Sequence, residues 1–145
     1  MQRYMGQLGN LLELCFALGR ISEARQYMEI LSNADADEPT KVLRKLSYAS
    51  YFGMELLTAE KKFDELYSYC QEVAPKLENA GTKMGLHHLL WNYFRLTASY
   101  FITGHYEEAL DAAAKVLAEE NFAGMKHHRA TTRLIQLMIY LEMGN

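Results

Sequence analysis

Apolar residues recur along nearly the whole chain at spacings of three and four positions. Leu89, Tyr93, Leu96 and Tyr100 form one such series, and this spacing places their side chains on one face of an α-helix. No segment alternates apolar and polar residues between hairpin turns, as a half-buried strand would. The pattern predicts an all-α protein with seven helices, at about 3–18, 21–33, 40–59, 62–79, 83–103, 106–120 and 125–143.

A short motif marks the turn between two helices and recurs along the chain. Its turn position is occupied by Gly19, Lys61, Gly104 and Gly144, which are 42, 43 and 40 residues apart. A period of this length indicates repeated helix pairs, each joined by a tight turn. Glycine suits the end of a helix because a left-handed backbone costs it little. We therefore expect Lys61 to be strained or to adopt a different turn.

The two prolines also predict local structure. Pro39 follows Asp37, which we expect to cap a helix whose first turn contains the proline. Pro75 lies inside the fourth predicted helix. Because proline lacks a backbone donor and crowds the preceding turn, we expect it to kink or split that helix after Val73.

The third repeat carries the fullest form of the motif. It reads Tyr93-x2-Leu96-Thr97-x2-Tyr100-x3-Gly104-x-Tyr106-x2-Ala109-x3-Ala113-x2-Val116. This pattern resembles the tetratricopeptide signature, and the first two repeats match it more loosely. The period of about 42 residues exceeds the family's usual period of about 34, and Asn121 stands where the family has a closing proline. Longer repeats of this kind are similar to the sensor domains of some bacterial transcription regulators.

The resemblance implies a right-handed α–α superhelix of stacked antiparallel helix pairs. The first helix of each pair would line a concave face, and the second would form the convex back. Residues 1–145 would be one domain, with repeats at about 1–37, 38–81 and 82–122 and a truncated repeat at 123–145. Stacked repeats present one long surface to a partner. The expected function is therefore a non-catalytic scaffold that binds a protein or peptide.

Candidate binding residues follow from the positions that face the groove in the resembling family. Tryptophan and arginine are frequent binding hot spots, which favours Trp91 and Arg95. The alternative for Trp91 and Phe94 is a core position, packed against the neighbouring repeat. The complete candidate set is Trp91, Phe94, Arg95, Ala98, Phe101, His88, Tyr48, Tyr51 and Arg133.

Charge is sorted between the two kinds of helix. The first-helix segments 1–19, 39–59, 82–104 and 124–143 hold nine basic and three acidic residues, whereas the rest holds six and fifteen. Several of these basic residues fall in first helical turns, where the helix dipole disfavours positive charge. Our hypothesis is a basic groove that recognises an acidic protein segment. The alternative is a chance distribution on a solvated face.

Other chemistry is weakly represented in the sequence. Cys15 and Cys70 are too few for a disulfide framework and lack metal-ligand spacing. The adjacent histidine pairs at 87–88 and 127–128 lack the spacing of a zinc helix. No nucleophile motif or phosphate loop is present, so we expect no enzyme activity, no metal and no cofactor. RNA binding is a less favoured alternative, because the sequence pI is about 5.9.

The sequence also predicts the cellular location of the protein. No apolar run approaches the length of about 20 residues that a membrane span needs, and residues 1–10 lack the pattern of a secretory signal. We therefore expect a cytoplasmic protein.

The last predicted helix is apolar almost all round, and repeat arrays normally end in a polar cap. We expect this helix to be covered by further chain of a larger protein, with homodimerisation as the second option. The other candidate function is a ligand- or peptide-sensing regulatory domain of a bacterial transcription regulator. Such a domain would hold a closed apolar pocket near Trp91.

Overall fold

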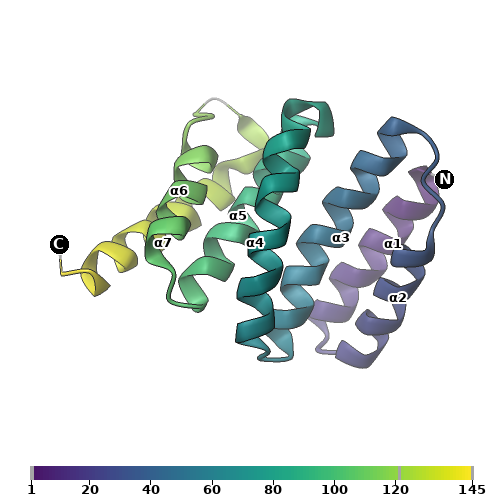
Figure 1. Ribbon diagram of the computed structural model, residues 1–145, viewed down its shortest axis with the longest axis horizontal. Helices are drawn as coiled ribbons and strands as arrows, with labels where there is room; N and C mark the ends of the chain where they lie inside the picture. The colour runs from purple at the N-terminus through teal and green to yellow at the C-terminus, as the bar shows by residue number, and fades with distance from the viewer. Residues whose placement is uncertain (1, 121, 145) are drawn as a thin grey trace.

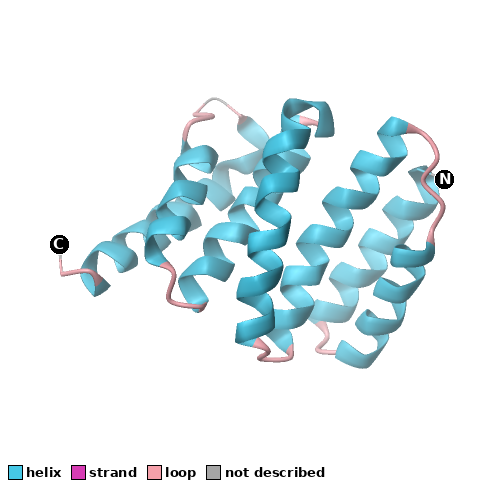
Figure 2. Ribbon diagram, viewed as in Figure 1, coloured by secondary structure: helices cyan, strands magenta, loops and turns pink. Residues whose placement is uncertain are grey.

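The computed structural model describes residues 2–120 and 122–144, most of which lie in seven α-helices (Figures 1 and 2). They are α1 (Gln2–Ala17), α2 (Ile21–Asn33), α3 (Pro39–Ala59), α4 (Phe63–Ala80), α5 (Leu86–Ile102), α6 (Tyr106–Leu117) and α7 (Lys126–Glu142). Two 3-10 helices, η1 (Gly81–Met84) and η2 (Ala123–Met125), precede α5 and α7. These described residues contain no strand, so the predicted all-α class and the seven helices are confirmed. Met1, Asn121 and Asn145 lie outside the described residues.

The helices pack in consecutive pairs, α1 with α2, α3 with α4 and α5 with α6. In addition, α3 contacts α1 and α5, and α5 contacts α7, so four alternate helices lie side by side (Figure 1). The second helix of each pair also packs on the first helix of the next pair. Within the described chain, α4 contacts neither α2 nor α6. The second helices α2, α4 and α6 therefore lie on the other side of the molecule as separate ribs, each packed on the first helices of its own pair and of the next.

The turns inside the three complete pairs share one backbone geometry. The residue at the turn has a left-handed backbone, with φ of +70° at Gly19, +57° at Lys61 and +80° at Gly104. In each turn this residue donates its N–H to the carbonyl three positions back, and the next residue donates to the carbonyl five positions back, over 2.8–3.2 Å. This is the Schellman arrangement that ends many helices. Lys61 thus keeps the common turn and adopts a conformation that strains an L-residue.

The apolar core runs along the array as two adjoining clusters. One cluster joins α1, α2 and α3 with Trp91 of α5, and at its centre Leu12, Leu31 and Phe52 are fully buried. The other joins α3 to α7 and contains Leu66 and Leu96. Each pair of helices buries its apolar stripe against the next, which is the packing that stacked repeats require.

Three local expectations differ from the structure. The sequence predicts that Pro75 kinks or splits α4 after Val73; the helix continues through Pro75 to Ala80, so a split is wrong. Pro75 is exposed on α4, where solvent can satisfy the carbonyl that loses its donor. The helix α5 begins at Leu86 and not at 83, because Gly85 interrupts the chain with φ of +95°. Glu38 holds the N-cap position of α3, and Asp37 instead lies 3.4 Å from the Lys41 ammonium.

The last helix keeps an exposed apolar stripe. Ile135 and Ile139 of α7 are buried in the core of the molecule. On the same helix, Leu134, Leu137 and Leu141 are 60%, 60% and 77% exposed. In the described part of the chain, no helix combines the length and apolarity needed to cross a membrane.

Candidate functional site

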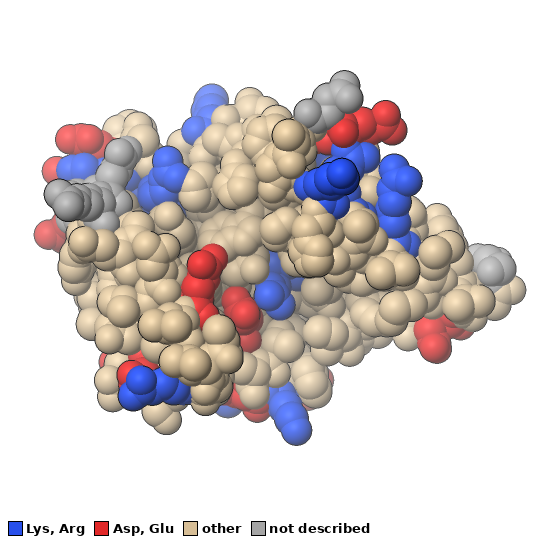
Figure 3. Space-filling model, turned by 180° about the vertical axis from the view of Figure 1, so that it is seen from behind, with Lys and Arg blue, Asp and Glu red and all other residues tan. Residues whose placement is uncertain are grey.

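The first helices of the pairs form one continuous side of the molecule, which we call the first-helix face. It is built by α1, α3, α5 and α7 and lies opposite the ribs formed by α2, α4 and α6. Figure 3 views the molecule from this side and shows a largely uncharged surface on which acidic and basic side chains meet near the centre. Most of the predicted binding residues belong to α3 and α5 of this face.

An aromatic cluster joins α3 to α5 beneath the centre of the face. Tyr51 stacks on Trp91 with ring centroids 3.6 Å apart and planes inclined by 14°. Phe52 and Tyr48 meet the Trp91 ring edge-on at 5.6 and 6.0 Å. Such aromatic pairs stabilise a fold by more than the burial of their apolar surface alone would. Trp91 is only 9% exposed, so it belongs to the core and offers little surface to a partner.

The cluster fits because α1 approaches α3 closely at a glycine. A Cβ atom at Gly9 would lie 2.8 Å from Cε1 of Tyr48. Glycine therefore leaves the room that the Tyr48 ring occupies. On α3, Tyr48, Tyr51 and Phe52 are three and four positions apart, a spacing that places neighbouring side chains on one helix face.

An ion pair lies beside the aromatic cluster. Nη2 of Arg95 is 3.6 Å from Oε1 of Glu55, and the guanidinium lies 5.1 Å from the centroid of the Tyr51 ring. Burial raises the pKa of Glu55, Arg95 opposes this rise, and the nearby Glu13 carboxylate of α1 adds to it. This group therefore combines one guanidinium with two carboxylates, and it is not the basic groove that the charge pattern suggested.

Two of the basic residues in the first half of α3 and of α7 bind the end of the preceding second helix. The Lys45 ammonium donates to the carbonyls of Ser32 and Ala34, both at 2.9 Å, where α2 ends. The Arg129 guanidinium donates to the carbonyl of Glu119 at 2.7 Å, just beyond the end of α6. Helix C-termini carry partial negative charge. The end of the preceding second helix thus offers partial negative charge to each of these two cations.

A polar network connects α3 to α5 at His88. Nδ1 of His88 donates to Oγ of Ser47 at 3.0 Å, while the Arg44 guanidinium donates to Nε2. The Asn92 amide donates to Ser47 Oγ and to the His88 carbonyl, each at 3.0 Å. Burial lowers the pKa of His88 to about 4, with a further lowering by Arg44. His88 is therefore a neutral ring whose two nitrogens are engaged between helices.

The remaining predicted residues lie elsewhere. The Phe94 ring meets the His128 ring of α7 edge-on at 4.7 Å, and Phe101 contacts Tyr106 of α6 at 6.0 Å. Ala98 is half-buried against the core. Arg133 is exposed on α7, apart from the others. The structure thus brings five predicted residues together: Tyr48, Tyr51, His88, Trp91 and Arg95.

Sequence reasoning missed the polar partners of these residues. Ser47 and Asn92 are buried within apolar helix faces, and a polar residue inside an apolar stripe was the available signal. Glu13 and Glu55 had no comparable signal, because an isolated glutamate on a helix is usually a solvated residue.

Five surface hollows of about 230 to 460 Å³ lie away from the aromatic cluster, and Trp91 lines none of these five. Among the described residues, no group of three or more His, Cys, Asp and Glu side chains is arranged to hold a metal ion.

The chain was compared with protein-family models, with curated proteins and with solved structures. None of these comparisons finds a match. The functional interpretation therefore rests on the residues and contacts described above.

Proposed function

We propose that the chain is a tetratricopeptide-like repeat scaffold that binds a protein or peptide on its first-helix face and has no catalytic role. The observation that carries this proposal is the side-by-side packing of α1, α3, α5 and α7. The common Schellman turn at Gly19, Lys61 and Gly104 supports it, because it repeats at the spacing of the sequence motif. Stacked pairs of this kind offer an extended surface that suits a polypeptide partner.

The centre of the face defines the chemistry of the proposed partner. Arg95 offers hydrogen-bond donors, and Glu55 and Glu13 offer acceptors. The side chains of Arg95 and Glu55 are 17% and 25% exposed, so a partner can reach both. A segment that carries both donors and acceptors matches this group better than a purely acidic one. The exposed Ile102 on α5 adds an apolar contact.

A ligand-sensing domain is less well supported. Its closed apolar pocket was expected near Trp91, whereas Tyr48, Tyr51 and Phe52 pack directly against that ring. RNA binding is also less well supported, because the cations at the start of α3 bind carbonyls, carboxylates and His88.

The two cysteines fit the proposed non-catalytic role and a cytoplasmic setting. Both are buried free thiols. Burial raises the pKa of Cys70 to about 12, which keeps this thiol protonated and unreactive. Homodimerisation through α7 stays a prediction that rests on its exposed leucines.

The test uses Trp91, which is the single tryptophan of the chain. Peptides are selected from a random library with the purified protein, and Trp91 fluorescence is followed during titration. A double variant, Glu55→Gln with Arg95→Gln, removes the central ion pair. The matched control, Glu72→Gln with Lys76→Gln, removes an exposed ion pair of α4.

We expect roughly tenfold weaker peptide binding in the first double variant, since two charge-assisted contacts are lost, and no change in the control. If both double variants bind the selected peptides as the natural protein does, the first-helix face is not the binding surface. Amide shifts confined to α2, α4 and α6 during titration would lead to the same conclusion.

A further inference from the structure

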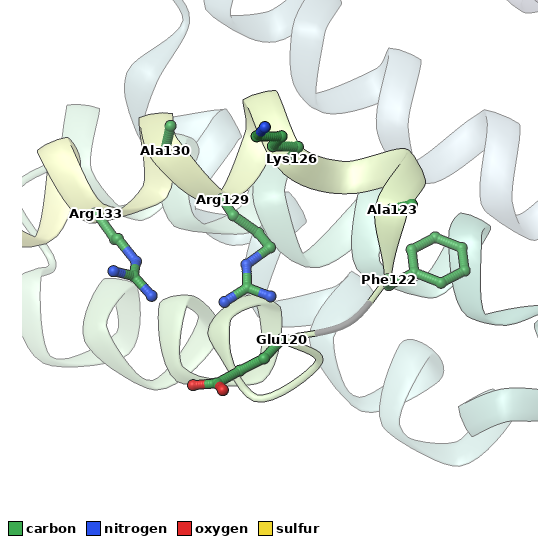
Figure 4. Close-up of a pocket in the computed structure, with 7 residues that line it drawn as sticks. All are labelled: Glu120, Phe122, Ala123, Lys126, Arg129, Ala130 and Arg133. Carbon is green, nitrogen blue, oxygen red and sulfur yellow. The ribbon is translucent and has the colours of Figure 1, made fainter.

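Three basic side chains of α7 line a hollow of about 450 Å³ beside the connection from α6 (Figure 4). Lys126, Arg129 and Arg133 follow one another at intervals of three and four residues, which places them along one side of the helix. In Figure 4 the guanidinium groups of Arg129 and Arg133 extend to the same side of α7, toward the segment that contains Glu120. The hollow is therefore a basic site apart from the α3–α5 cluster of the first-helix face.

The cations of this hollow differ from their counterparts at the start of α3. Lys41 lies within 3.6 Å of two carboxylates, and Arg44 is bonded to His88. Across the described residues, no ion pair within 4 Å involves Lys126 or Arg133. Arg129 donates one N–H to the Glu119 carbonyl, which holds its guanidinium in place. The other N–H groups of that guanidinium remain to bind an acceptor.

The lining of the hollow combines positive charge with apolar surface. Three cations and the single carboxylate of Glu120 give the lining a formal charge of +2. Phe122, Ala123 and Ala130 add apolar surface between the charges. A carboxylate-bearing chain with an apolar side chain complements both features. An RNA strand is a poorer match, because it needs a basic groove that follows several phosphates.

We propose that this hollow binds an acidic segment of a partner protein, through carboxylates on Lys126, Arg129 and Arg133 and an apolar residue near Phe122. The charge pattern of the sequence predicts an acidic partner in the groove of the first helices, and the hollow offers a site for one at the start of α7, beside the end of α6. The proposal does not rest on the function proposed for the α3–α5 cluster, since none of its lining residues belongs to α3 or α5.

The test compares two short peptides by calorimetry with the whole protein. The acidic probe is acetyl-Glu-Glu-Phe-Glu-Glu-amide, and its neutral counterpart carries Gln at each Glu position. The test variant is Lys126→Gln with Arg133→Gln, because both side chains are exposed and support no described contact. The matched control is Lys76→Gln with Lys83→Gln, which removes the same charge from exposed positions outside the hollow. Circular dichroism checks that both variants keep their helices.

The natural protein should bind the acidic probe and prefer it over the neutral peptide. The test variant should bind it roughly tenfold more weakly, the control should stay within about twofold, and added salt should weaken binding. Equal binding of the two peptides, or no binding of the acidic probe at about 1 mM, overturns the proposal. Equal losses in the two variants, or tighter binding of a ten-nucleotide mixed RNA at the same residues, overturn it as well.

Discussion

Replacing Lys61 with glycine should stabilise the protein. Lys61 occupies a turn in which the equivalent residues are Gly19 and Gly104, and its φ of +57° lies in the left-handed region. The side chain is exposed and takes part in no ion pair within the described residues. The substitution therefore removes backbone strain without removing a contact that holds the fold together.

The expected gain follows from two opposing terms. A left-handed conformation costs an L-residue roughly 1–2 kcal/mol. Glycine avoids this cost but loses about 0.5–1 kcal/mol more through its greater freedom in the unfolded chain. The net gain should be about 0.5–1 kcal/mol, and each kcal/mol should raise Tm by about 2–4 °C in a chain of this size.

Urea and thermal unfolding followed by circular dichroism would measure this gain. The reciprocal variant, Gly104→Lys, should lose a similar amount, because φ is +80° there and nothing lies within 4 Å of an added Cβ. Lys62→Gly is the control: the neighbouring φ is −90°, so this change should only destabilise. A Lys61→Gly protein no more stable than the natural one, together with an unaffected Gly104→Lys protein, would refute the reasoning.

Three further predictions concern glycines and buried polar groups. Gly53→Ala should lower the free energy of unfolding by about 1–3 kcal/mol, because the new Cβ would lie 2.6 Å from the Tyr69 hydroxyl. Gly6→Ala should raise it by about 0.5–1 kcal/mol, because nothing lies within 4 Å of the new Cβ. Equal effects of the two substitutions in urea unfolding would contradict the packing described. Asn92→Ala should cost about 1–3 kcal/mol, since it removes the buried amide that donates to Ser47 and to the His88 carbonyl and leaves a cavity in its place. A loss below about 0.5 kcal/mol in the same assay would show that the network contributes little to stability. The free energy of unfolding should fall as pH drops from 6.5 to 4, because the unfolded chain protonates His88 near pH 6.5 whereas the folded protein does so only near pH 4. Above pH 6.5 this contribution should be constant, and a His88→Gln variant that keeps the full pH dependence would assign the effect to other groups.

The fold was largely predictable from local signals. Helix spacing and the recurring turn gave all seven helices, because both signals act within a few residues of the chain. The start of α5 was predicted three residues too early, because the sequence around Gly85 does not predict its positive φ. The continuation of α4 through Pro75 depends on exposure to solvent, which spacing alone does not show.

The candidate site was less predictable because it depends on contacts between separate helices. The sequence placed Trp91 and Arg133 in one groove, yet the first is buried under Tyr51 and the second lies beside the end of α6. The basic pattern at the start of α3 and α7 predicts a surface for a partner. Lys45 and Arg129 instead bond to carbonyls that lie 11 to 13 and 10 residues away along the chain. A pattern within one helix cannot show which neighbouring helix end a long side chain reaches.

The hydrogen-bonded group of Ser47, His88 and Asn92 has a mechanical consequence for the array. Apolar contacts are non-directional, so they oppose a slip of one helical turn, about 5.4 Å, between two helices less specifically than hydrogen bonds do. Such a slip between α3 and α5 would strand the fully buried Asn92 amide in a dry environment. We expect the packing of α3 on α5 to be the most rigid helix junction of the molecule. Bending should then concentrate at α1–α3 and α5–α7, where aromatic rings such as Phe16 against Phe52 and Phe94 against His128 tolerate small displacements.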